Sequence, residues 1–438
     1  MVRRIISLLL CGVMFMVVLS GCSREEPPAP TETVAPTQEP TQAVEEVELT
    51  FPGDARPYLG VELEFLTLLE VDDPRVEVME QAADVFETRT GAKVKFYWLG
   101  NDESVLAANL EGGVKVDIFG ANLDSLQNTF AQYTLDLTDL AEAADYARSS
   151  HEVLRRQVVE RCGNLAGIPQ TPVLYGMYYN EDSLAESGVS ELPGTWEELL
   201  SFSEALVQAG FMPMAMDIES CHVALELLLE RQFGYEQFET LMIQSGWTWD
   251  TAYIDVFKRA IDYAGAGYLA KGDPSAFPSG QEKLTLSNVV MVPGTSEICV
   301  QVERGTLMDV NWGVFPYPGD GPGKGFGVES QTLSIHKNCE NPQAAFDFIM
   351  LLTTGAFDQL YADLGNGIPA DPGNDFSLTG ARELLAQADT RGMGLLGPEN
   401  NELFSRLWNG WYKTAGYFAS AMNELDVNRQ PKVTQGVG

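Results

Sequence analysis

Three acidic residues follow the first apolar stretch of the body of the chain. Glu70, Asp72 and Asp73 come directly after the segment VELEFLTLL. Carboxylates accept hydrogen bonds from hydroxyl groups, and a suitably spaced pair can hydrolyse a glycosidic bond. Such clusters are usually solvated loop charges, but α/β proteins build their sites at the carboxyl ends of strands. The cluster is therefore a candidate site, and carboxylates alone leave a secreted glycosidase open.

Other common catalytic patterns are missing from the sequence. The three histidines stand in unrelated segments, and neither H-E-x-x-H nor G-x-S-x-G occurs. The loop 319–327 is rich in glycine, but Gly325 follows Lys324 where a phosphate-binding loop needs Ser or Thr. We interpret this loop as a hairpin connection between two strands. We expect no catalytic residue, no metal site and no cofactor.

The N-terminal residues have the pattern of an export signal. Arg3 and Arg4 precede an uncharged apolar run that is too short to span a bilayer comfortably. The run ends in Leu19-Ser20-Gly21-Cys22, which resembles the lipobox of bacterial lipoproteins. The resemblance implies a signal peptide at 1–21, cleavage before Cys22, and a lipid such as palmitate on its thiol. Residues 22–48 are rich in Pro, Thr and Glu, which predicts a disordered tether.

Charge and cysteine content narrow the choice of partners. The formal net charge is −36, so the surface should repel nucleic acid and anionic lipid headgroups. Outside the N-terminal region, cysteines are widely spaced and show no metal-binding pattern, which leaves disulfides and free thiols both open. These are Cys162, Cys221, Cys299 and Cys339.

The elements that must position any site alternate between strand-like and helix-like stretches, which predicts an α/β fold with mainly parallel sheets. Expected strands cover 61–69, 92–99, 114–121 and 172–180, with two more on either side of the loop 319–327. Expected helices cover 74–91, 194–210, 341–365 and 401–426. The helix 194–210 is the best marked, because Thr195 and Glu198 form a capping box and Gly210 supplies its end.

The order of segments resembles the extracellular solute-binding proteins of the carbohydrate class. GNLAGIPQTPVLYGMYYNEDSLAESGVSELPGTWEEL is the strongest match, and VDIFGANLDSLQNTFAQYTLDLTDL precedes it. AFPSGQEKLTLSNVVMVPGT, SIHKNCENPQAAFDFIMLLTT and GNGIPA follow in the family's order. The resemblance therefore covers nearly the whole body of the chain.

The family's fold, carried over, is a two-lobed periplasmic-binding-protein-like fold (type II) with crossing hinge strands. Lobe one would comprise 50–170 and 312–361, and lobe two would comprise 171–311 and 362–438. The resemblance implies a lipid-anchored monomer on the extracellular face of the cytoplasmic membrane. It would capture a sugar or oligosaccharide between the lobes and deliver it to the transmembrane subunits of an ABC permease. The same scaffold carrying a polyamine, a peptide or a phosphodiester stays open, as does a sensor subunit.

The resemblance also implies which strand ends and helix starts face the ligand. The ligand-binding residues expected from it are Glu70, Asp72, Asn122, Thr171, Tyr175, Glu219, Thr295, Glu329, Ser330, Trp408 and Trp411. For Tyr175 and Trp408 a place in the core is favoured over ligand contact, and Thr295 would serve equally well as a helix cap. Trp196, Tyr178 and Tyr179 are expected in the core, whereas the roles of Trp247 and Trp249 stay open. The resemblance implies Trp within 292–295 and an aromatic or amide residue where this chain has Gly120 and Ala121, and the lack of both favours a smaller or less conventional ligand.

Overall fold

The computed structural model describes residues 56–100, 102–215, 218–243, 258–260, 262–270, 289–299, 310–390 and 393. All of them belong to one unit of the chain, Val47–Gly438. The predicted signal peptide, lipidated Cys22 and tether, Trp247, Trp249, Trp408, Trp411 and the predicted helix 401–426 lie outside the described residues.

The first three strands form a parallel group. β1 (Glu62–Thr67) pairs in parallel with β2 (Lys93–Trp98) and with β3 (Ile118–Asn122). α2 (Arg75–Thr90) connects β1 to β2, and Gly91 ends it with a φ of 83°, a left-handed conformation that favours glycine. The sequence predicted each of these elements, although β3 begins four residues later than the expected strand.

A single mixed sheet joins all the described strands, in the order β2-β1-β3-β8-β4-β6-β5 with β7 also paired to β4. Its other members are β4 (Ile168–Asn180), β5 (Met212–Met214), β6 (Val289–Thr295), β7 (Trp312–Phe315) and β8 (Gly327–Ile335). Among the described strands, β1–β2, β1–β3 and β5–β6 pair in parallel, and the other strand pairs are antiparallel. The predicted α/β class is confirmed, but parallel pairing does not dominate the centre of the sheet.

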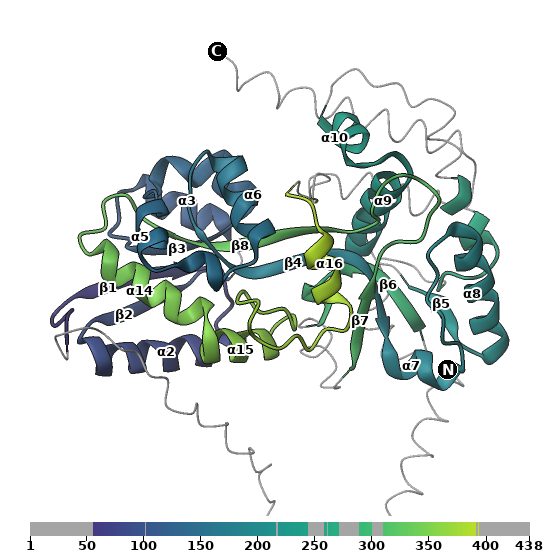
Figure 1. Ribbon diagram of the computed structural model, residues 1–438, viewed down its shortest axis with the longest axis horizontal. Helices are drawn as coiled ribbons and strands as arrows, with labels where there is room; N and C mark the ends of the chain where they lie inside the picture. The colour runs from purple at the N-terminus through teal and green to yellow at the C-terminus, as the bar shows by residue number, and fades with distance from the viewer. Residues whose placement is uncertain are drawn as a thin grey trace, which may run out of the picture. The chain divides into compact units, whose positions relative to one another are not determined.

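β4 and β8 carry the sheet from one group of strands to the other. β4 is 13 residues long; residues 168–175 pair with β8, and residues 175–180 pair with β6 and β7. β8 in turn pairs with β3 through residues 331–335. Figure 1 shows these two strands running between the purple-blue elements and the teal elements. Residues on β4 and β8 are thus positioned by both groups.

The glycine-rich loop is not a hairpin, so that interpretation was wrong. β7 and β8 both pair with β4, Phe315 opposite Met177 and Gly327 opposite Tyr175. The two strands therefore follow one another along the same edge of β4. The loop is an excursion out of that edge, and its base is closed by the hydrogen bond from Tyr317 N to Gly325 O at 2.6 Å.

Helices cover the sheet, and Figure 1 shows α2 and α14 on one side of the β1–β3 group with α3 and α5 on the other. α8 has the predicted capping box and a left-handed Gly210. The expected helix 341–365 is two helices, because Thr354 takes an extended conformation between them (φ −140°, ψ 152°) and Gly355, with a φ of 60°, begins the second. The longer described helices are α3 (Glu103–Glu111), α5 (Thr138–Ala143), α6 (Glu152–Cys162), α7 (Glu181–Ser187), α8 (Trp196–Ala209), α9 (Ile218–Phe233), α10 (Tyr235–Ile243), α14 (Pro342–Thr353), α15 (Gly355–Asp363) and α16 (Ala381–Gln387).

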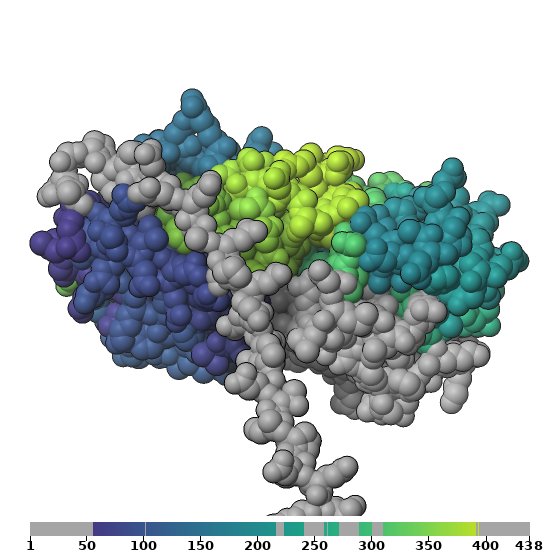
Figure 2. Space-filling view, turned by 90° about the horizontal axis from the view of Figure 1, so that it is seen from below, coloured from purple at the N-terminus to yellow at the C-terminus, as the bar shows by residue number. Residues whose placement is uncertain are grey.

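Separate apolar clusters stabilise the two groups of strands. Phe65, Phe86 and Phe348 are fully buried beside β1, with the Phe86 and Phe348 rings 5.2 Å apart. Met177 and Tyr179 on β4 belong to a second cluster with helices α8 and α9. On the face seen in Figure 2, the yellow-green atoms of the segment near residues 350–390 lie between the purple-blue and the teal atoms. Tyr178 is fully buried and Tyr179 is 7% exposed, as expected of core residues.

Candidate functional site

A pocket of about 450 Å³ lies where β3, β4, β6 and β8 meet. Among the described residues, eleven side chains line it; ten of these are polar or charged, and Val173 is apolar. The carboxylates are Glu103, Asp124, Glu297 and Glu329; the amides are Asn122 and Gln331; the hydroxyls are Ser125, Tyr175, Thr295 and Ser330. Such a lining suits a ligand that offers many hydroxyl groups.

Strand register brings these residues together. Asn122 ends β3 opposite Gln331 of β8, and Glu329 lies two residues before Gln331, on the same face of the strand. On β4, Val173 lies opposite Glu329 and Tyr175 lies opposite Thr295 of β6. Five residues predicted from the sequence therefore line one pocket: Asn122, Tyr175, Thr295, Glu329 and Ser330.

The wall next to β3 is held by Glu103, the first residue of α3. Its carboxylate accepts a hydrogen bond from Asn122 N at 3.3 Å and another from the Ser125 hydroxyl. α4 (Leu123–Ser125) begins directly after Asn122. Glu103 thus fixes the chain where β3 turns into α4, and it places Asp124 at the pocket.

Glu329 is a largely buried carboxylate of the pocket. Its side chain is 13% exposed and lies 3.2 Å from the Arg161 guanidinium. Burial raises the pKa of Glu329 to about 8, because desolvation and the nearby Asp124 outweigh the favourable effect of Arg161. At neutral pH a large share of Glu329 is therefore protonated and can donate as well as accept a hydrogen bond.

Tyr175 is half-buried and packs against the cluster formed with α8 and α9. Burial raises its pKa well above the ordinary value, and the negative charge of Glu329 adds to this effect. It therefore contributes both to the core and to the pocket, the two roles that the sequence left open.

Ser296, rather than Thr295, makes the buried hydrogen bonds after β6. Its hydroxyl accepts from Leu174 N at 3.2 Å and lies 3.3 Å from Pro172 O. The Asn366 amide also donates to Pro172 O and to Ser296 Oγ, at 2.6 and 3.1 Å. This node ties β4 and β6 to the GNGIPA turn.

Three of the other predicted residues, Glu70, Asp72 and Thr171, do not line this pocket. Glu70 and Asp72 are exposed on the turn after β1, whereas their neighbour Asp73 is buried and bonded to Arg75 at 2.7 Å. Thr171 is buried on β4 opposite Gln331. Glu219 lies in the first turn of α9, and its side chain is outside the description.

Several lining residues were missed at the sequence level. Asp124 and Ser125 stand two and three residues after Asn122, and Glu297 and Gln331 stand two residues after Thr295 and Glu329, so extending each predicted site by up to three residues would have found them. Glu103 gave no such signal, because it reaches the pocket from another helix.

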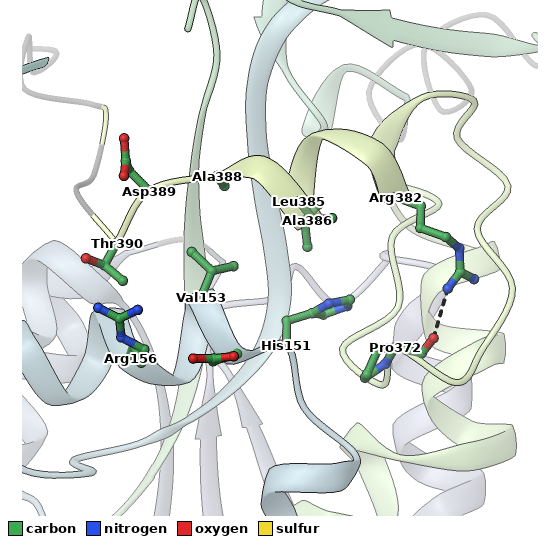
Figure 3. A pocket seen from close by; sticks show the side chains of 11 residues that line it. His151, Val153, Arg156, Pro372, Arg382, Leu385, Ala386, Ala388, Asp389 and Thr390 are labelled. Atoms are coloured by element: carbon green, nitrogen blue, oxygen red, sulfur yellow. Dashed lines mark hydrogen bonds between the residues drawn. The ribbon is translucent and has the colours of Figure 1, made fainter. Parts of the chain in front are cut away.

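A second hollow of about 480 Å³ lies between α6 and α16 (Figure 3). Several polar side chains of this hollow have partners in the protein. His151 lies 3.0 Å from Pro369 O, and Arg382 donates to Pro372 O at 3.0 Å and Asn374 O at 2.7 Å. Burial lowers the pKa of His151, so its imidazole is neutral at pH 7. We regard this hollow as secondary to the pocket at β3, β4, β6 and β8.

Within the described ranges, no group of His, Cys, Asp or Glu side chains could hold a metal ion. Cys162 and Cys339 are free thiols. None of the helices among these residues is both long and apolar enough to cross a bilayer.

Comparison with known proteins points to one family. Residues 73–217 match the model of the family described as bacterial extracellular solute-binding protein. A search of curated proteins found no match. Among solved structures, a chitin oligosaccharide binding protein is 21% identical, with a TM-score of 0.62 over 84% of this chain and 98% of the other.

RafE resembles the chain in two solved forms. The unliganded form from Streptococcus pneumoniae is 17% identical, with a TM-score of 0.68 over 86% of this chain and 98% of the other. RafE in complex with raffinose is 18% identical, with a TM-score of 0.64 over 84% of this chain and all of the other. The chain thus has the α/β fold of the solute-binding proteins. Over residues 73–217 it matches the bacterial extracellular family, and the resemblance expected from the sequence is confirmed.

Proposed function

We propose that the protein is the substrate-binding component of an ABC importer and that it captures a sugar or oligosaccharide in the pocket at β3, β4, β6 and β8. The observation that carries the proposal is the lining of that pocket by carboxylates, amides and hydroxyls. The fold supports it, because the similar solved proteins include binders of raffinose and chitin oligosaccharide. The protein acts by binding alone and needs no catalytic group.

The predicted ligand residues acquire roles in this proposal. Asn122, Thr295, Glu329 and Ser330 provide hydrogen bonds to ligand hydroxyls, and Tyr175 offers a ring face to the apolar side of a sugar. Glu70, Asp72, Thr171, Glu219, Trp408 and Trp411 remain candidates for contacts in a closed state.

Closure of two lobes completes the proposal. The proposed lobe boundaries, 50–170 with 312–361 and 171–311 with 362–438, fall within β4, at the start of β7 and within α15. A ligand that contacts both lobes favours the closed state by its differential affinity. Small-angle X-ray scattering with and without a bound saccharide would measure the compaction, and an unchanged radius of gyration would argue against closure.

A thermal-shift screen tests the ligand class. Raffinose, stachyose and chitin oligosaccharides form one arm; spermidine, a tripeptide and glycerophosphodiesters form the other. A ligand at 100 times its Kd stabilises the folded state by about 2.7 kcal/mol, which is measurable as a rise in Tm. Protection only by the second arm would overturn the sugar assignment, and cleavage of a saccharide during long incubation would establish a glycosidase.

Attachment to the membrane through Cys22 is the final part of the proposal. It places the protein on the extracellular face of the cytoplasmic membrane as a monomer that docks on permease subunits. Mass spectrometry of the protein expressed in a bacterial host should find a diacylglyceryl adduct on Cys22. A Cys22→Ser variant should leave the membrane fraction.

A further inference from the structure

Arg161 joins residues of the pocket without lining it. It lies in the last turn of α6, its side chain is 16% exposed, and its donors reach three partners. Nε donates to Gln127 Oε1 at 2.8 Å, one terminal nitrogen lies 3.2 Å from Glu329 Oε1, and the other contacts Asp124 Oδ1. The planar guanidinium therefore holds two pocket carboxylates in fixed directions.

The two carboxylates depend unequally on Arg161. Asp124 is 51% exposed, so without a partner its side chain is free to turn into solvent. Glu329 is largely buried beside Tyr175, and the nearby Asp124 and Glu226 disfavour its ionised form. Arg161 is the cation that favours ionised Glu329, and it does so from α6 rather than from a strand of the sheet.

We propose that Arg161 is a positioning residue for ligand binding: it holds Asp124 and Glu329 in the orientation in which both accept hydrogen bonds from one polyhydroxylated ligand. The inference rests on the proposed function, because it concerns the same pocket. It goes further by assigning affinity to a residue that does not contact the ligand.

A change in the pH dependence of affinity follows. An ionised carboxylate is a stronger acceptor than a protonated one, so affinity rises as Glu329 loses its proton. Removing Arg161 disfavours the ionised form, and the midpoint of that rise must move to higher pH. A residue that only stabilised the fold would lower stability without moving this midpoint.

The test uses the full-length protein with three substitutions on α6. Arg161→Met removes the charge, Arg161→Lys keeps it, and Arg156→Met is the matched control. Arg156 lies on the same helix, is 55% exposed and bonds to Glu160 at 2.8 Å; it borders the second hollow instead (Figure 3). Calorimetric titration with raffinose, stachyose and a chitin oligosaccharide from pH 6 to pH 9 gives the affinity at each pH and the midpoint of its rise with pH.

We expect Arg161→Met to weaken binding by about 10- to 100-fold, since two hydrogen bonds to charged groups lose their geometry. Its midpoint should rise, Arg161→Lys should recover part of the affinity, and Arg156→Met should bind as the native protein does. Unchanged affinity and midpoint in a folded Arg161→Met protein would overturn the proposal.

A measurement without ligand separates this inference from the proposed function. Carbon-13 labelling of glutamate side chains allows the Glu329 carboxyl to be titrated by NMR, with Glu329→Gln for assignment. The midpoint should rise in Arg161→Met and stay in place in Arg156→Met. If no saccharide binds the native protein, the proposed function fails, and this titration alone decides whether Arg161 controls Glu329.

Discussion

The glycine-rich loop should tolerate no side chain at Gly323. A Cβ built there would lie 1.9 Å from the carbonyl oxygen of Glu230 and 2.8 Å from Arg231 Cα. Both atoms belong to the backbone near the end of α9, so neither can move aside as a flexible side chain could. Gly323→Ala must therefore push the loop away from α9.

The expected loss of stability follows from the hydrogen bonds that the loop makes. The buried Glu230 carboxylate accepts from Lys324 N at 2.9 Å and from Gly325 N at 2.7 Å. Hydrogen bonds to charged groups contribute about 1.5–3 kcal/mol each, so losing both should lower the free energy of unfolding by about 3–6 kcal/mol. That is a large part of the total stability of about 5–15 kcal/mol typical of folded proteins.

Equilibrium unfolding in urea, followed by circular dichroism, would measure the effect. Gly265→Ala is the matched control, because its Cβ would meet nothing within 4 Å and its φ is not positive. It should be neutral or stabilising by up to about 1 kcal/mol. If Gly323→Ala unfolds at the same urea concentration as the native protein, the loop does not depend on its contact with α9.

Three further predictions use the same unfolding assay. Burial raises the pKa of Glu329 to about 8 and that of Asp358 to about 7, so folded-state proton binding stabilises the protein most below about pH 4. This stability is lost as the pH rises towards 8, and Glu329→Gln or Asp358→Asn should each flatten the pH profile by about 4–5 kcal/mol; parallel profiles would contradict this. Asn366→Ala leaves buried Pro172 O without its amide donor and should cost about 1–3 kcal/mol, whereas a neutral result would mean that the node at Ser296 is dispensable. Phe348→Ala removes a fully buried ring and should lower the free energy of unfolding by about 3–5 kcal/mol. A loss below about 1 kcal/mol would show that neighbouring side chains fill the cavity left by the ring.

Local patterns predicted the elements that depend on local chemistry. α8 follows from its capping box and Gly210, and α2 follows from apolar spacing and Gly91. Strand pairing lies beyond such patterns. The β7–β8 connection looked like a hairpin because two strands flank a glycine-rich loop, yet both strands prefer β4 as partner.

The candidate site was predictable only where it follows the ends of strands. Asn122 and Glu329 stand on strands whose family pattern is visible in the sequence, and the structure brings them to one pocket. Glu103 and Arg161 come from helices, and their long side chains reach the site across the fold. The spacing of residues in the sequence cannot predict these contacts, because they depend on how α3 and α6 pack.

The register of β4 against β8 shifts between Pro169 and Thr171, which leaves Gln170 as an additional residue at the start of the crossing. An additional residue lets a strand change its twist locally while the flanking rungs of the ladder stay intact. We expect rotation between the two groups of strands to be concentrated there, close to the pocket. Hydrogen exchange at Gln170 and Thr171 that slows with saccharide would identify this bulge as the pivot.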